Sequence, residues 1–201
     1  MGIILAFITF VLFAFYLLRR AAVVRERSDF IDRFSFDLSI QRRVADQYPH
    51  LTPSQIQSVL EGLRDYFKFS LHAKGMLSMP SQAVDEAWHA FILSTKAYDH
   101  FCQRAFGKFL HHHPAETMAS PTQATRGIKR IWNLACRKEN INPSSPQRLP
   151  RLFALDSELK IPGGLVYSLN CLAAGAANSY CASEIGGGCG GGGCGGEIGR
   201  A

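Results

Sequence analysis

The chain has 201 residues, a mass of 22.2 kDa, 47% hydrophobic and 19% charged residues, and a mean hydropathy of −0.01. This length suits one domain of ordinary size, and the apolar content excludes a wholly disordered protein. The averages combine three unlike parts: an apolar start, a middle of roughly 130 residues that suits one compact domain, and an end in which ten of the last sixteen residues are glycine.

Residues 2–18 are almost entirely apolar, with Thr9 as the one clearly polar side chain. As a helix this run rises about 26 Å, slightly short of a hydrocarbon core of about 30 Å, and the arginines that follow it can snorkel outward. A cleaved signal peptide, the alternative, carries its positive charge before the apolar run, whereas here the basic residues come after it. The sequence therefore predicts an uncleaved transmembrane anchor with a basic flank over residues 1–24.

The basic flank also predicts an orientation. Arg19, Arg20, Arg25 and Arg27, less Glu26, give +3, which is half of the formal net charge of +6. Because cytoplasmic flanks carry the excess of Lys and Arg, we expect a single-pass protein in the lipid bilayer with its C-terminal domain in the cytoplasm. The pI of 9.1 therefore needs no nucleic-acid partner to explain it, and no basic stripe interleaved with aromatic residues points to one.

The middle of the chain, residues 28–160, has the patterns of a mainly α fold. Thr52, Pro53 and Gln55 form the signature of a helix start, and the apolar spacing after them predicts a helix to about Leu71. The same spacing predicts a helix over about 81–107, another over about 122–138, and an earlier amphipathic segment over 30–47. No segment sustains the period-two alternation of strands, so we expect a small helical bundle.

Beyond Asn140 the composition changes. Prolines recur, which predicts an ordered but irregular strap whose Leu149, Leu152, Phe153 and Leu155 pack back on the bundle. Residues 161–185 are mildly apolar and rich in small side chains, which favours a linker or a further helix. Residues 186–201 predict a disordered tail rich in glycine and cysteine.

A motif in the middle of the chain consists of Val84-Asp85-Glu86-Ala87-Trp88-His89, Tyr98, Phe101-Cys102, Phe106-Gly107 and His112-His113-Pro114. This motif resembles the core of the glycine-rich domain-containing protein-like family, in a short, membrane-anchored form of the bacterial kind. The resemblance covers about residues 51–138, and the glycine-rich tail is a second, less specific match. Since that family is largely of unknown function, with suggested roles in plant stress responses and development, the resemblance implies little about a reaction.

The motif holds a candidate metal site. Asp85 and His89 are four residues apart, so they point the same way from one helix face. A histidine from the run 111–113 could supply the third ligand for zinc or iron, and His112 and His113 are the candidates. An open fourth position on the ion would permit chemistry on bound water, as in a metal-dependent enzyme. The alternative, which the sequence favours, is a hydrogen-bonded bracket that holds two helices in register.

The six cysteines fall into two groups. Cys102 and Cys136 lie on apolar helix faces and are expected in the core, and a cytoplasmic location favours free thiols throughout. Cys189 and Cys194 belong to the tail, where four glycines separate them, a wider spacer than that of most zinc knuckles. A flexible tail without a ligand is favoured, and a metal- or thiol-reactive appendage is the alternative.

These patterns contain no recognised catalytic constellation, so no catalytic residue is expected. The sequence favours a cytoplasmic helical domain that acts as a binding or scaffolding module at the membrane, with an unidentified protein partner. A metal ion, zinc or iron, held by Asp85, His89 and a histidine of the run 111–113 stays open.

Overall fold

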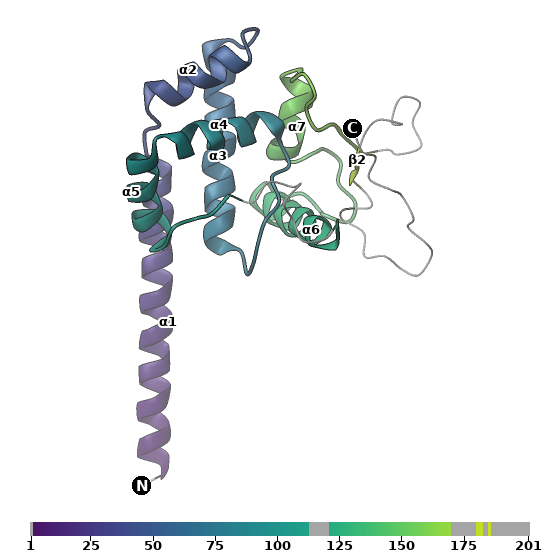
Figure 1. Cartoon of the computed structure of the whole chain (residues 1–201). Coiled ribbons are helices and arrows are strands. Elements are labelled where there is room, and N and C mark those ends of the chain that lie inside the picture. Colours follow the sequence, from purple (N-terminus) through teal and green to yellow (C-terminus); the bar gives the residue numbers. More distant parts are fainter. Residues whose placement is uncertain (1, 113–120, 170–179, 183–184, 186–201) are drawn as a thin grey trace.

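The computed structural model describes residues 2–112, 121–169, 180–182 and 185. The fold is mainly helical, as predicted, and Figure 1 shows a bundle from which the first helix projects. The described helices are α1 (Gly2–Arg33), α2 (Leu38–Gln47), α3 (Pro53–His72), α4 (Gln82–Leu93), α5 (Thr95–Phe106), α6 (Pro121–Lys138) and α7 (Arg151–Glu158). Two short strands, β1 (Tyr167–Ser168) and β2 (Tyr180–Cys181), pair in parallel.

Helix α1 combines the predicted anchor with the first helix of the domain. Its large apolar side chains from Ile3 to Leu18 are exposed, and the helix is long and apolar enough to cross a membrane. It continues without a break to Arg33, and Ile31 near its end is 1% exposed in the core. The apolar segment is therefore joined to the bundle by continuous helix rather than by a linker.

The sequence predicted one amphipathic segment over 30–47, but the structure divides it between α1 and α2. The Arg64 guanidinium donates to carbonyl groups at the end of α1, including that of Asp32 at 2.9 Å, and so satisfies groups that a helix end leaves without partners. The Asp37 carboxylate then accepts a 2.7 Å hydrogen bond from the backbone of α2 and caps its start. These two contacts fix the change of direction.

Helix α3 runs through the middle of the bundle, as Figure 1 shows. Its capping box is present at Thr52 and Gln55, and the helix ends one residue beyond the predicted Leu71. A Cβ atom on Gly62 would stand 2.8 Å from the Val84 side chain, so this glycine permits the close approach of α4. Helices α1, α2, α4, α6 and α7 all pack on α3.

The sequence predicted one helix over 81–107, but the structure has two, separated at Ser94. Ser94 has the non-helical angles φ −84° and ψ 58°, and its N–H donates to the Phe91 carbonyl at 3.0 Å. The bend brings the Tyr98 ring against Phe91, with 5.2 Å between ring centroids, and leaves Thr95 exposed, whereas an unbroken helix would place Thr95 on the same face as Phe91. Apolar periodicity on both sides of the break conceals it in the sequence.

A cluster of aromatic rings joins α1 to α3, α4 and α5. Phe101 lies at its centre, fully buried, with its ring centroid 4.7 Å from that of Phe34 and 4.9 Å from that of Phe67. Such edge-to-face and tilted contacts add specificity to the burial of apolar area. The other rings in contact with Phe101 are those of Phe30, Phe91 and Phe106.

Helices α6 and α7 cover the other side of α3. Helix α6 was predicted within one residue, and its Trp132 packs edge-on against Phe153 of α7 at 4.9 Å. The strap after Asn140 is irregular up to Pro150, as predicted, and then forms α7, with Leu152, Phe153 and Leu155 buried and Leu149 partly buried. Asp65 of α3, only 5% exposed, pairs with Lys138 and Arg151 and ties the three helices together.

The structure describes part of the region 161–185, for which a linker or a further helix was predicted, and a short strand pair lies there. Tyr167 pairs with Tyr180 and Ser168 with Cys181, while residues 170–179 and the tail 186–201 lie outside the described residues. Cys102 and Cys136 are buried free thiols, as predicted. The expectation of free thiols is wrong for Cys181, which is disulfide-bonded. That expectation rested only on the compartment indicated by the basic flank, and not on any local feature of this cysteine.

Candidate functional site

The predicted acid–imidazole motif lies on α4, and the start of this helix is firmly held. The Ser81 hydroxyl accepts from the backbone N–H of Val84 and caps the helix. The Asp156 carboxylate, 2% exposed, accepts from the Ser81 hydroxyl at 2.6 Å, from the Gln82 N–H at 2.6 Å and from the Leu165 N–H at 2.9 Å. A buried negative charge at a helix N-terminus is favourable, so Asp156 fixes the helix that carries Asp85.

The segment that follows α5 is held against α4 by a chain of hydrogen bonds. The Trp88 indole N–H donates to the Tyr98 hydroxyl at 3.0 Å, and that hydroxyl donates to the Leu110 carbonyl. Burial raises the pKa of Tyr98 well above its ordinary value, so the phenol stays a neutral donor. The Trp88 ring then meets the His112 ring, with 4.4 Å between centroids.

Three ligand-type side chains meet where this segment reaches α4. The Nε2 atom of His112 lies 2.8 Å from Oδ1 of Asp85, and Nε2 of His89 lies 3.7 Å from Oδ2 of the same carboxylate. The ligand-type atoms of the three residues all lie within 4.8 Å of one another. The side chains of His112, Asp85 and His89 are 10%, 22% and 43% exposed, so the cluster opens to solvent on the His89 side.

Two tyrosines respond to burial and to the charge of Asp85. Burial, followed by the charges of Glu86, Asp156 and Asp85, raises the pKa of Tyr48 to about 12. Burial and then the Asp85 charge likewise raise the pKa of Tyr66, whose ring packs on Trp88 at 5.0 Å. Because burial disfavours a charge of either sign, these shifts mark the desolvated side of the cluster.

The dimensions of the cluster suit one small divalent ion. Zinc binds His nitrogen and Asp oxygen at about 2.0–2.2 Å, so neighbouring ligand atoms on a tetrahedral ion stand about 3.3–3.5 Å apart. The Asp85 oxygens lie 2.8 and 3.7 Å from the two imidazole nitrogens, which brackets that spacing. To hold an ion together with the other two residues, the His89 side chain, which is 43% exposed, would turn toward Asp85.

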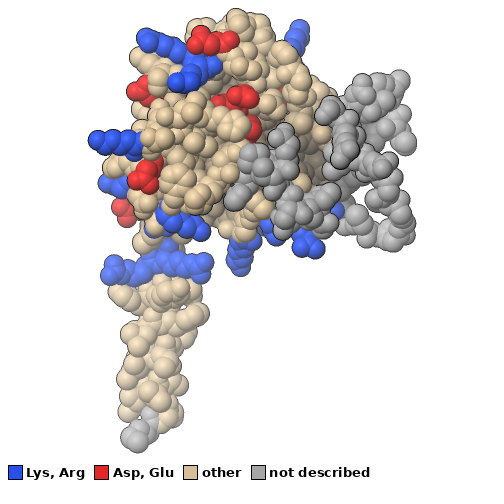
Figure 2. Space-filling view, in the orientation of Figure 1, with Lys and Arg blue, Asp and Glu red and all other residues tan. Residues whose placement is uncertain are grey.

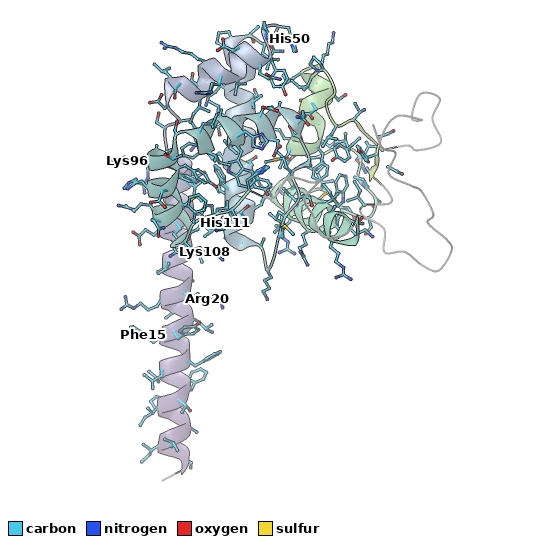
Figure 3. All side chains as sticks on the ribbon, in the orientation of Figure 1. Phe15, Arg20, His50, Lys96, Lys108 and His111 are labelled. Carbon is cyan, nitrogen blue, oxygen red and sulfur yellow. The ribbon has the colours of Figure 1, made fainter. Side chains whose placement is uncertain are left out.

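The structure brings together three of the residues predicted as ligands, namely Asp85, His89 and His112. His111 is exposed and its ring lies beside that of Phe109, at 4.9 Å, away from this cluster; Figure 3 labels it on the segment after α5. His113 and the tail thiols of Cys189 and Cys194 lie outside the described residues.

Sequence reasoning did not find the groups that position this site. The bridge from Trp88 through Tyr98 to Leu110 selects His112, and Asp156 fixes the start of α4. Trp88 and Tyr98 belong to the motif, so their spacing in the sequence could have indicated a role at the site. No sequence pattern indicated Asp156, because it lies 71 positions beyond Asp85 in the chain.

These features define a helical protein with one candidate membrane helix and an acid–imidazole cluster on its bundle. The chain belongs to the UCP032817-like family, whose model matches residues 26–185. This match covers the end of α1, the bundle and the whole cluster. Comparison with curated proteins and with solved structures gave no match.

Proposed function

We propose that this protein is a membrane-anchored helical module that binds one divalent metal ion, zinc or iron, through Asp85, His89 and His112. The observation that carries the proposal is the convergence of one carboxylate and two imidazoles whose ligand-type atoms lie within 4.8 Å of one another, open to solvent on the side of His89. The fixed start of α4 supports it, because a site that is already assembled loses little entropy when it binds an ion.

Binding of an ion would replace the hydrogen bond between His112 and Asp85. A carboxylate only accepts, so Nε2 of His112 carries the proton in this 2.8 Å bond. An ion bound at Nε2 needs the lone pair of that nitrogen, so the neutral imidazole would carry its one proton on Nδ1 instead.

The first prediction concerns metal content. The purified full chain, equilibrated with zinc or ferrous iron and then desalted, is expected to retain close to one ion, measured by elemental analysis. His89→Ala and Asp85→Asn should each lower the affinity by more than about tenfold. His100→Ala is the matched control, because His100 is exposed on α5, outside the cluster.

The hydrogen-bonded bracket is the competing function, and the bond between His112 and Asp85 favours it. His89 distinguishes the bracket from the metal site. The side chain of His89 is 43% exposed, and its nearest carboxylate oxygen is 3.7 Å away, too far for a hydrogen bond. A bracket thus predicts that His89→Ala changes little, whereas the metal proposal predicts loss of the ion from a folded protein. An ion-free parent chain with a destabilised His112→Ala variant would leave the bracket as the function.

We further propose that α1 spans the membrane and that the bundle faces the cytoplasm. The basic side chains Arg19, Arg20, Arg25 and Arg27 at the inner end of the apolar run support this orientation. The disulfide at Cys181 favours the opposite one, because disulfides persist in oxidising compartments.

The second prediction concerns this orientation. A fluorescent protein fused to the C-terminus is expected to fluoresce, since it folds in the cytoplasm, and alkaline phosphatase fused at the same point is expected to be inactive. Active phosphatase without fluorescence would place the bundle outside and would make the disulfide at Cys181 the better guide.

The resemblance to glycine-rich domain-containing proteins remains our hypothesis beside the family match. It is supported by one coincidence: the motif residues Asp85, Trp88, His89, Tyr98 and His112 are those that build the cluster. We also propose a protein partner, whose binding the membrane-anchored bundle would localise.

A further inference from the structure

A groove lies where the apolar part of α1 meets the bundle. One face of α1, carrying Leu17, Arg20, Ala21, Val24 and Arg25, forms its wall, and His72 at the end of α3 faces it. The groove has a volume of about 470 Å³. The groove begins at the exposed apolar surface of α1 and extends along this helix to the charged residues next to the bundle.

The two arginines of this groove are free to bind a ligand. Within the part of the chain that the structure describes, neither Arg20 nor Arg25 has an ion-pair partner, whereas Arg27, two residues beyond Arg25, donates to the Phe106 carbonyl at 2.9 Å. Asp29, at the end of the groove nearer the bundle, is its one lining carboxylate. Figure 2 shows Lys and Arg side chains gathered where the bare part of α1 reaches the domain.

The groove is amphiphilic along the axis of α1. Leu17, at the end nearest the apolar run, continues the exposed apolar surface of α1, and Arg20, Ala21, Val24 and Arg25 follow it toward the bundle, so both guanidinium groups lie beyond this apolar surface. Guanidinium groups bind phosphate through paired hydrogen bonds. The order of apolar surface and then cations matches the order of acyl chain and then phosphate in a phospholipid at the membrane interface.

We propose that this groove is a binding site for one anionic phospholipid, with its phosphate held by Arg20 and Arg25 and an acyl chain along Leu17 and the exposed apolar surface of α1 that precedes it. The site rests on the proposed insertion of α1 in the bilayer, and it is independent of the metal cluster. A zwitterionic lipid offers the same phosphate but adds a cation that the arginines repel, so selectivity for net negative headgroups follows.

The test uses the full chain in detergent micelles, where the orientation of the protein has no influence. Native mass spectrometry would follow the titration of dioctanoyl phosphatidylglycerol, dioctanoyl phosphatidylcholine and inorganic phosphate. We expect one phosphatidylglycerol per chain, bound at least about tenfold more tightly than either of the other two probes. The double variant R20Q/R25Q is expected to lose this preference.

The matched control is R42Q/R43Q, which removes the same charge from exposed positions on α2, at the end of the bundle away from the anchor (Figure 1). It should bind phosphatidylglycerol as the parent does. Equal weakening in both double variants, equal binding of phosphatidylcholine, or equal binding of free phosphate would each overturn the proposal. Alkaline extraction of cell membranes distinguishes a failure of the lipid site from a failure of the membrane anchor. Release of the protein into the extract would refute the insertion of α1 in the bilayer. Retention of the protein in the membrane, together with unselective lipid binding in micelles, would refute only the lipid site in the groove.

Discussion

Replacement of Asp156 by alanine is expected to lower the free energy of unfolding by about 3–4 kcal/mol. The carboxylate is 2% exposed and accepts from Ser81, Gln82 and Leu165, so the variant leaves buried donors without a partner. Hydrogen bonds to a charged group contribute about 1.5–3 kcal/mol each, and water entering the gap recovers part of the loss. Urea unfolding of the full chain in detergent, followed by the fluorescence of the buried Trp88 and Trp132, measures the change.

Glu158→Ala is the control for this prediction, since Glu158 is exposed at the end of the same helix. It should change the stability by less than about 0.5 kcal/mol. Equal effects of the two substitutions would contradict the role given to Asp156. Because Asp156 holds the start of α4, its replacement should also weaken metal binding at Asp85, even though it is no ligand.

Phe101→Ala is expected to have a similarly large effect, about 3–5 kcal/mol, because it removes a fully buried ring from a packed core. Phe101 contacts the rings of Phe30 and Phe34, so the cavity opens where the end of α1 joins the bundle. The same urea titration measures the loss. Leu93→Ala, at a position that is 65% exposed, should change the stability by less than about 0.5 kcal/mol. If Phe101→Ala lowered the free energy of unfolding as little as Leu93→Ala does, the prediction would be wrong, because the neighbouring rings would then have filled the cavity.

Several elements of the fold are recorded in short stretches of sequence. The capping box at Thr52 and the apolar spacing after it give α3 to within a residue, and the apolar run gives the exposed part of α1. The spacing of Asp85 and His89 gives two members of the candidate site. Each of these depends on groups within about one or two helical turns, where geometry is set by the helix itself.

Other features depend on contacts between distant residues. The break at Ser94 is stabilised by the rings of Phe91 and Tyr98, which meet only after α5 has turned back. Helical periodicity in the sequence therefore does not reveal this break. The change from α1 to α2 depends on Arg64, thirty residues further along, which donates to the Phe34 carbonyl.

The sequence by itself therefore determined the helical class, the apolar N-terminal segment with its basic flank, and the motif that contains the acid–imidazole pair. Only the tertiary structure decided that His112 rather than His111 meets Asp85, because the Tyr98 hydroxyl fixes the Leu110 carbonyl and so sets the register of the segment that follows. It also decided that Arg20 and Arg25 share a groove with His72, since that depends on how α1 packs beside α3. Local patterns fix what each helix is, and long-range packing fixes which side chains meet.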